Sequence, residues 1–497
     1  DTATFNLFGY DVETLSGIVN SGYLYLKGNE TVTGGITNEV GSTVVYNGTG
    51  TYTTLAAGES YYDLIFSGSG SWTMAQDASV AGDLLVVNDA TLNLSTYNLA
   101  VTGDVTIGAY NQEEKIATII VGSSSGAGLS AQNITISEFG RLICASAGNP
   151  VVTVYGNWEN SGTSDYDTGF TAGAGTVNFA GTVPGKTIES GENDYQFFNI
   201  SFTGNGGAWT LSDNMTVTGA FSVTNGSFIS GAKTVTISGA SASYVNVNAA
   251  NTVWTNGTLN IQSDLSQSLP ANETYNILRI GRYSSSGGPT VYTMGNGTAI
   301  TTPQASDGWT IDSDARVLLT VAWSAANKEY DGTTDVSVDF TDSHIAGFYE
   351  NFDLDYTAAF ENKNVADGKT VNITGITITG GDSGKYVLSS ETGTALADIT
   401  PKELTVGGSF TADNKVYDGS TTASFDVYGL TLTGVIAGEE ALVLLAEGDV
   451  DIDFDTKDAG LGKTVSITDG ELSGAGSGNY TLSLEGAPTT SADITEK

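Results

Sequence analysis

The 497-residue sequence has almost no cysteine or histidine. Its one cysteine, Cys144, excludes an intramolecular disulfide, and its apolar neighbours favour a buried structural thiol. Its one histidine, His344, has no nucleophile signature beside it, so we interpret it as a loop or surface residue rather than part of a catalytic triad. A zinc site built from histidine and cysteine is excluded by these counts.

Basic residues and long hydrophobic runs are also missing. Seventeen Lys and Arg face 56 Asp and Glu, for a net charge of −39. Nucleic acids need clustered basic side chains, so we expect no nucleic-acid partner. No stretch approaches the run of about 18 apolar residues that spans a bilayer, so we expect no membrane insertion. Scarce cysteine and a first residue that is Asp1 rather than Met favour a secreted protein with a processed N-terminus.

What the chain does contain is short strands and turns. Residues 1–320 alternate segments such as YLYL and DLIF with clusters of Gly, Asn, Asp and Ser. The strand centres lie too close together for helical crossovers, which leaves antiparallel sandwiches or a parallel β-solenoid. We favour the solenoid because a strand–turn cassette recurs, at about 41–108 and 175–240, and because its polar turns can stack as ladders. Trp72 and Trp209 occupy equivalent points of the cassette, and we predict that both lie in the core.

A second repeat fills the last third of the chain. KEYDGTT at 328–334 returns as KVYDGST at 415–421, and each copy later reaches a GKTV segment and a Gly-x-Tyr segment. Turn signals about every ten residues predict two immunoglobulin-like β-sandwiches, at 321–408 and 409–497. Residues 320–327 are expected to be the joint with the solenoid.

These two tail units resemble the YDG domain of bacterial and archaeal surface adhesins, including proteins of the filamentous-haemagglutinin type. The resemblance rests on the repeated segments above, and residues 1–320 are similar in pattern to the β-solenoid parts of the same class. It implies an extracellular structural or adhesive role. Physically, the motif is turn chemistry, in which Asp-Gly makes the bend, and Tyr packs at the sandwich edge and hydrogen-bonds through its hydroxyl. The motif residues, which we interpret as structural, are Tyr330, Asp331, Gly332, Tyr417, Asp418 and Gly419.

Acidic residues supply the candidate chemistry. Alternating acids in GDVDIDFDTKD share one strand face, as a solvated sandwich face would, and calcium binding is the sharper alternative. That candidate site consists of Asp449, Asp451, Asp453 and Asp455. A polysaccharide-degrading enzyme would need two facing carboxyl groups, and Asp-x-Asp places two acids on one strand face. The candidate pairs are Asp165 with Asp167 and Asp312 with Asp314.

Twelve Asn-x-Ser/Thr sequons make N-linked glycans a possible modification. Asn199 lies inside an apolar strand and is a poor acceptor. The remaining candidates are Asn29, Asn47, Asn93, Asn133, Asn214, Asn225, Asn256, Asn272, Asn296, Asn372 and Asn479.

Together these features predict an all-β protein of the cell surface that is not an enzyme. We expect a structural subunit that assembles with copies of itself into a sheath, surface layer or filament, or an adhesive rod. A monomeric adhesin that binds surface glycans, and a β-helix enzyme acting on polysaccharide, are the alternatives.

Overall fold

The computed structural model describes residues 4–13, 17–108, 115–122, 128–163, 166–191, 195–284 and 286–497. Within these ranges the regular elements are β-strands and short 3-10 helices, with no α-helix. The all-β class predicted from the sequence is confirmed. The chain divides into two compact units, the first made of residues 1–319, 343–351 and 381–387, and the second of residues 320–342, 352–380 and 388–497.

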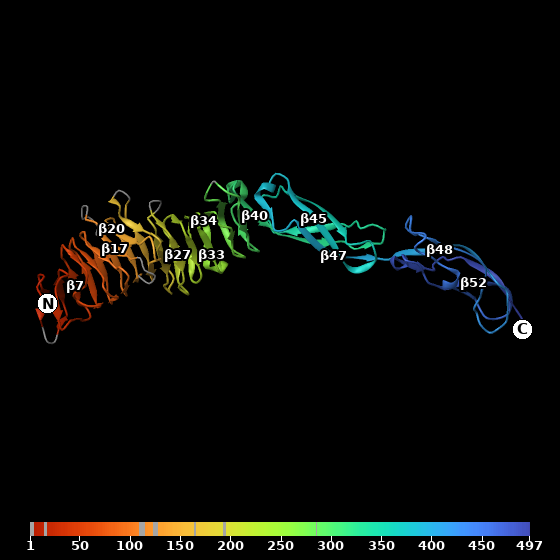
Figure 1. The fold of residues 1–497 in the computed structure, drawn as a ribbon, viewed down its shortest axis with the longest axis horizontal. Helices are drawn as coiled ribbons and strands as arrows, with labels where there is room; N and C mark the ends of the chain where they lie inside the picture. Colours follow the sequence, from red (N-terminus) through yellow and green to blue (C-terminus); the bar gives the residue numbers. More distant parts are fainter. Residues whose placement is uncertain are drawn as a thin grey trace. The chain divides into compact units, whose positions relative to one another are not determined.

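The first unit is a parallel β-solenoid of about 13 turns. One coil runs through β10 (Asp63–Phe66), β11 (Ser71–Thr73) and β12 (Ala78–Val80), and β13 (Leu84–Val86) begins the next. The coils stack along the solenoid (Figure 1). Neighbouring coils pair in parallel, so that Leu64 of β10 pairs with Leu84 of β13. This pairing confirms the solenoid and excludes antiparallel sandwiches for this part of the chain.

The interior of the solenoid is filled by columns of apolar side chains, one from each coil. Alternate residues of each strand point inward, as in β10, where Leu64 and Phe66 are fully buried. Another part of the interior is aromatic, where the ring of Phe202 contacts those of Trp209 and Phe228 at centroid distances of 5.7 and 5.3 Å. Burying each such side chain contributes about 1.5–3 kcal/mol, so the columns stabilise every coil against its neighbours.

Trp72 and Trp209 are both fully buried, as predicted. They lie on different sides of the coil, however. Trp72 is in β11, which pairs with β8 (Thr51–Tyr52) and β14 (Thr91–Asn93), whereas Trp209 is in β28 (Ala208–Leu211) of the long sheet that contains β10 and β13. The two copies of the sequence cassette therefore lie on different sides of the solenoid. The same strand–turn–strand sequence suits a corner between any two strands of a coil.

A ladder of Asp and Asn side chains follows one turn along the solenoid. The Oδ1 atom of Asp63 accepts a hydrogen bond from the backbone N–H of Asp83 at 3.0 Å, and Asp83 accepts one from Asp104 at 2.8 Å. The ladder continues through Asn133, Asn157 and Thr187. A glycine precedes several of its members because the side chain of the coil below fills the space: a Cβ at Gly103 would lie 2.3 Å from Oδ1 of Asp83.

The solenoid ends differently from the prediction. Its last strand, β40 (Ala315–Leu319), pairs with β37 (Thr290–Thr293) and with β46 (Tyr386–Leu388). Residues 320–327, predicted to be a joint, instead contain β41 (Val321–Ala325), which pairs antiparallel with β43 (Val338–Asp342). The partner strand lies outside any local sequence window, which is why the pairing was not foreseen.

The second unit contains two sandwiches of two sheets each. The first sandwich has β41 with β43, and a sheet of β42 (Lys328–Glu329), β47 (Thr392–Thr400), β45 (Ala366–Thr379) and β44 (Asp353–Phe360). The second has a sheet of β50 (Phe425–Thr433), β48 (Lys402–Ala412) and β53 (Tyr480–Ser483), and a sheet of β49 (Lys415–Val416), β54 (Thr489–Thr495), β52 (Gly460–Gly470) and β51 (Val450–Phe454).

The core of the second sandwich lies between its two sheets. Val406 and Phe410 of β48 pack in one cluster with Ile452 of β51 and Val465 of β52. β47 ends at Thr400 and β48 begins at Lys402, so Pro401 separates the sandwiches and β48 opens the second one, as the sequence TPKELTVGGSF at 400–410 predicts. The predicted division between residues 408 and 409 falls inside β48.

Candidate functional site

The two sandwiches meet at a buried carboxylate, that of Glu439. The hydroxyl of Tyr330 donates hydrogen bonds to both of its oxygens, at 2.8 and 3.0 Å, and the hydroxyl of Tyr480 donates to Oε2 at 2.7 Å. The ammonium group of Lys363 forms an ion pair with Oε1. Tyr330 and Lys363 belong to the first sandwich, and Glu439 and Tyr480 to the second. We call this cluster, with the contacts in the next paragraph, the sandwich junction.

Amide and apolar contacts complete the sandwich junction. The backbone N–H of Val365 donates to Oδ1 of Asn479 at 2.9 Å. Gly332, in the YDG turn of the first sandwich, has a φ of +80°, and a Cβ built there would lie 3.1 Å from Ile436 of the second sandwich. The side chain of Tyr330 is 1% exposed. The junction therefore combines the buried ring of Tyr330, the ion pair between Lys363 and Glu439, and the hydrogen bond from Val365 to Asn479.

The pKa values of the junction reflect this geometry. Burial raises the pKa of Glu439, but the hydrogen bonds from Lys363, Tyr480 and Tyr330 lower it more, and the net pKa is below its ordinary value. Burial and then the Glu439 carboxylate raise the pKa of Tyr480 to about 12. The carboxylate is thus held ionised and both phenols are held protonated across the neutral range.

The glutamate is presented by a loop that occurs in both sandwich sequences. Residues 436–439 read Ile-Ala-Gly-Glu, and residues 345–348 read Ile-Ala-Gly-Phe. The second loop belongs to the first unit, where the ring of Phe348 contacts that of Trp309 in the last coil at 5.7 Å. In each case a tyrosine supports the loop: the hydroxyl of Tyr386 donates to the carbonyl of Phe348 at 3.4 Å, and that of Tyr480 accepts from the N–H of Ile436 at 3.2 Å.

This docking loop was missed in the sequence analysis. Its signal was present, because the Ile-Ala-Gly triplet stands at the same place in both copies of the repeat. The residue after the triplet matches the surface that it meets: phenylalanine meets tryptophan, and glutamate meets tyrosine and lysine.

The YDG turns bend as predicted, and the Tyr330 hydroxyl is hydrogen-bonded as predicted, but the Tyr417 hydroxyl has no hydrogen-bond partner among the described residues. Gly332 and Gly419 have φ values of +80° and +86°, which a side chain rarely adopts. Oδ1 of Asp418 accepts hydrogen bonds from the N–H and hydroxyl of Ser420, both at 2.8 Å, and from Lys415. These three contacts, in that order, lower the pKa of Asp418 to about 2. Asp331 has the same arrangement with Thr333 and Lys328, and both aspartates are held in structural turns.

Comparison with known families agrees with this repeated architecture. Residues 315–394 and 400–491 match the family model of the YDG domain. The tail consists of two YDG domains. No curated protein and no solved structure gives a significant match to the chain. The first match begins at β40, so the first YDG domain shares that strand with the last coil of the solenoid.

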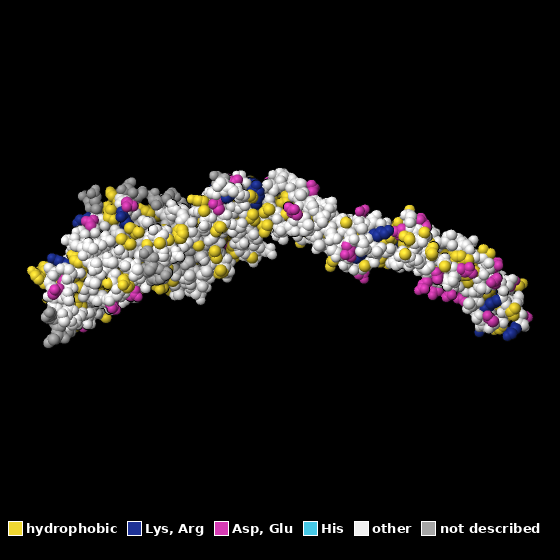
Figure 2. All heavy atoms as spheres, in the orientation of Figure 1, with side chains coloured by type: hydrophobic (Ala, Val, Ile, Leu, Met, Phe, Trp, Pro, Cys, Tyr) yellow, Lys and Arg dark blue, Asp and Glu magenta, His cyan; other side chains and the backbone are white. Residues whose placement is uncertain are grey.

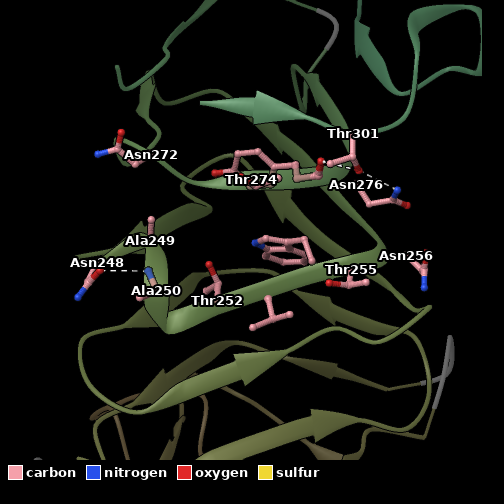
Figure 3. Close-up of a pocket in the computed structure, with 13 residues that line it drawn as sticks. Asn248, Ala249, Ala250, Thr252, Thr255, Asn256, Asn272, Thr274, Asn276 and Thr301 are labelled. Carbon is pink, nitrogen blue, oxygen red and sulfur yellow. Dashed lines mark hydrogen bonds between the residues drawn. The ribbon is translucent and has the colours of Figure 1, made fainter. Parts of the chain in front are cut away.

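A shallow groove lies on the solenoid where β34 (Thr252–Ser263) and β36 (Thr274–Gly281) pair irregularly (Figure 3). Its volume is about 580 Å³. Neutral side chains line it, and the amide of Asn276 donates to the hydroxyl of Thr301 at 3.1 Å across one end. Asn256 and Asn272, two sequon residues, lie on its rim. The lining suits a neutral, hydroxyl-rich molecule.

Glu273 is buried close to the groove, with 1% of its surface exposed. The hydroxyls of Tyr244 and Tyr275 each donate to it at 2.6 Å, and the indole N–H of Trp254 donates at 3.0 Å. Thr252 and Asn246 add further hydrogen bonds. Burial, followed by the Glu273 carboxylate, raises the pKa of Tyr244 far above its ordinary value. This saturated network fixes the two aromatic residues that line the groove, Trp254 and Tyr275.

The candidate calcium residues do not come together. In β51, Asp451 and Asp453 alternate with buried Val450, Ile452 and Phe454, which confirms the predicted sandwich face. Asp449 lies instead in a 3-10 helix, η6 (Glu447–Asp449). Asp455 pairs with Lys463 at 3.0 Å. Across the described ranges, no cluster of three or more Asp, Glu, His or Cys side chains is arranged to hold a metal ion. Figure 2 shows acidic side chains gathered over the second YDG domain.

The carboxylate pairs considered for an enzyme are not supported either. Asp165 lies outside the described residues, and Asp167 forms an ion pair with Arg141 at 2.7 Å. Asp312 and Asp314 lie in the turn between β39 (Trp309–Ile311) and β40, not on one strand face as predicted. The turn forms because β39 and β40 belong to successive sides of one coil.

The sequons fall into three groups. Asn133 and Asn479 are engaged through both side-chain atoms, Asn133 in the Asp/Asn ladder and Asn479 at the sandwich junction. Asn93 and Asn214 each accept one backbone hydrogen bond. Exposed candidates are Asn29, Asn47, Asn225, Asn256, Asn272, Asn296 and Asn372.

The remaining rare residues have simple environments. Cys144 is buried, as predicted, and burial raises its pKa to about 12, so the thiol is unreactive. His344 lies 3.9 Å from Glu350 in the segment that closes the last coil. No helix within the described ranges has the length and hydrophobicity needed to cross a membrane.

Proposed function

We propose that the protein is an extracellular structural protein of the cell surface that assembles with copies of itself or serves as an adhesive rod. One observation carries this proposal: the coils of the solenoid repeat and stack on one another, and the two sandwiches repeat and are held together by a dedicated contact. Coil stacks on coil through parallel pairing, and the second YDG domain is docked on the first by Glu439. Such architecture extends a chain and presents surface.

The first coils of the solenoid carry apolar groups that suit contact with another molecule. Phe5, Phe8 and Tyr10 are 52%, 63% and 74% exposed. The three side chains lie close together in the sequence, and contiguous exposed apolar surface marks interaction sites in soluble proteins. The net charge of −39 opposes random association, so contact through this apolar patch would be selective.

Negative-stain electron microscopy of the full chain tests the proposal. We expect regular fibres, tubes or sheets, and we expect a triple variant Phe5→Ser, Phe8→Ser, Tyr10→Ser to remain dispersed. The matched control replaces exposed Val183, Val247 and Leu265 by serine and should still assemble. Monodisperse protein at all concentrations and salt conditions, without binding to cell surfaces, would refute a structural or adhesive role.

The groove near Glu273 supports glycan binding as a second candidate function. Amide and hydroxyl side chains such as Asn276 and Thr274 match the hydrogen-bonding groups of a neutral saccharide. The candidate ranks below assembly because Trp254 and Tyr275 are buried and offer no aromatic platform. Titration with neutral oligosaccharides distinguishes the two, with Asn276→Ala expected to abolish binding and Asn296→Ala to preserve it.

A further inference from the structure

The second YDG domain repeats the acceptor half of the sandwich junction. Tyr417 follows β49 as Tyr330 follows β42, and the two backbone N–H groups donate to the carbonyls of Thr495 and Thr400, each at 2.9 Å. Lys457 lies between β51 and β52, as Lys363 lies between β44 and β45. The segments align as FENKNV at 360–365 and FDTKDA at 454–459.

This second acceptor is open, whereas the first is filled. Tyr330 is 1% exposed, whereas Tyr417 is half-buried and its hydroxyl has no hydrogen-bond partner among the described residues. A Cβ at Gly332 would meet Ile436, but one at Gly419 would meet nothing within 4 Å. The ammonium group of Lys457 is exposed and, within the described ranges, unpaired, although Lys363 pairs with Glu439.

We propose that Tyr417, Gly419 and Lys457 form a binding site for the Ile-Ala-Gly-Glu loop of a further YDG domain joined in tandem behind the second. The loop's glutamate would accept from the Tyr417 hydroxyl and pair with Lys457, as Glu439 does with Tyr330 and Lys363. Asp458 stands where Asn364 accepts a hydrogen bond from the Asn479 amide, and its carboxylate offers the same acceptor.

The last side chain of the loop decides which loop the site can bind. A glutamate suits a tyrosine hydroxyl beside a lysine, because a charge-assisted hydrogen bond is stronger than a neutral one. The Ile-Ala-Gly-Phe loop would bring an apolar ring to the same place and leave the ammonium group unpaired. A second intact copy of the chain is a poor occupant, because its own Glu439 loop is already bound.

An extended chain tests the site. A second copy of residues 401–495 is inserted after Thr495, which reproduces the Thr400–Pro401 connection. Hydrogen–deuterium exchange then compares the peptides around Tyr417 and Lys457 in the native and extended chains, with the peptides around Tyr330 and Lys363 as the internal standard. We expect exchange at the new junction to slow about tenfold or more. Glu439→Phe in the inserted copy, or Lys457→Met, should remove the protection, and replacing the exposed Lys497 by methionine should not.

Three outcomes would overturn the proposal. Unchanged exchange at Tyr417 and Lys457, while the first junction and the strands of the inserted copy stay protected, would show that the site binds no such loop. Protection that survives Glu439→Phe would show that the glutamate does not recognise it. Protection that grows with protein concentration would place the occupant on another molecule. A second version with a flexible linker of about ten residues before the copy keeps the test valid if the direct fusion fails to fold.

Discussion

The hydroxyl of Tyr330 donates a hydrogen bond to the carboxylate of Glu439, a residue 109 positions later in the chain. The two residues lie in different copies of the repeat, at positions that do not correspond. Tyr330 belongs to the YDG turn, and Glu439 to the docking loop. The motif that names the domain is therefore also the surface on which the next domain docks.

Removing this hydroxyl tests its contribution. Tyr330→Phe keeps the ring but leaves the buried carboxylate with one donor fewer, and we expect it to lower the stability of the junction by about 1–2 kcal/mol. Hydrogen exchange of the amide of Val365, which bonds across the junction, measures the effect. The matched control is Tyr417→Phe, whose hydroxyl has no partner within the described ranges. Equal losses for the two variants would contradict the assigned role.

Acid should open the junction. The pKa of Glu439 is lowered in the folded state, so its contribution is present above its ordinary value of 4.5 and is lost as the pH falls through the folded value. The hydrogen bond to the Glu439 carboxylate raises the pKa of Lys363 above its ordinary value of 10.5. The contribution of this ion pair is therefore complete below pH 10.5 and is lost as the pH rises through the raised pKa. We expect the stability difference between the native chain and Glu439→Gln to be constant from about pH 5 to 9 and to shrink below about pH 4.5. A difference that is flat down to pH 2 would contradict this.

The alternation of apolar and polar residues predicted much of the fold. It identified the solenoid strands, the buried Trp72 and Trp209, and the exposed and buried faces of β51, because each depends on neighbours within a few residues. The side of the coil on which each tryptophan lies could not be predicted, since it depends on the total length of the intervening coils. The 3-10 helix that contains Asp449 was missed because strand alternation does not show where a strand begins.

The functional contacts were harder to predict for the same reason. β41 pairs with β43, and Glu439 binds Tyr330, across stretches that no local pattern connects. The repeat itself carried the missing information. The loops Ile-Ala-Gly-Phe and Ile-Ala-Gly-Glu share three residues and differ in the fourth. This is the pattern expected of one loop that binds a different partner in each copy.

The ladder glycines should be intolerant of even a methyl group. A Cβ at Gly103 would lie 2.3 Å from Oδ1 of Asp83 and 2.5 Å from the carbonyl oxygen of Gly82, so Gly103→Ala must displace the coil below. We expect the solenoid to lose about 1–3 kcal/mol of unfolding free energy. Gly288→Ala, where a Cβ meets nothing within 4 Å, should change stability little. Urea unfolding followed by circular dichroism measures both, and the ladder geometry is wrong if the two variants behave alike.

Calcium should leave the stability of the chain unchanged. Asp449, Asp451, Asp453 and Asp455 are divided between a 3-10 helix, a strand and an ion pair. We expect the melting temperature of the full chain to be the same with millimolar calcium or with a chelator. A calcium-dependent rise that Asp451→Asn with Asp453→Asn removes would restore the metal site predicted from the sequence.

The buried carboxylate of Glu273 should be sensitive to the kind of replacement. Glu273→Gln keeps one acceptor oxygen, and the hydroxyls of Tyr244 and Tyr275 can rotate to accept from its amide, so we expect a modest loss. Glu273→Leu removes every acceptor and leaves the indole N–H of Trp254 unpaired in a dry interior, and we expect a loss of about 3–5 kcal/mol. Urea unfolding with tryptophan fluorescence distinguishes the two, and Glu59→Leu at an exposed position controls for the added apolar surface. If the leucine variant proved as stable as the glutamine variant, the donors would be satisfied by water, and the groove floor would be open rather than sealed.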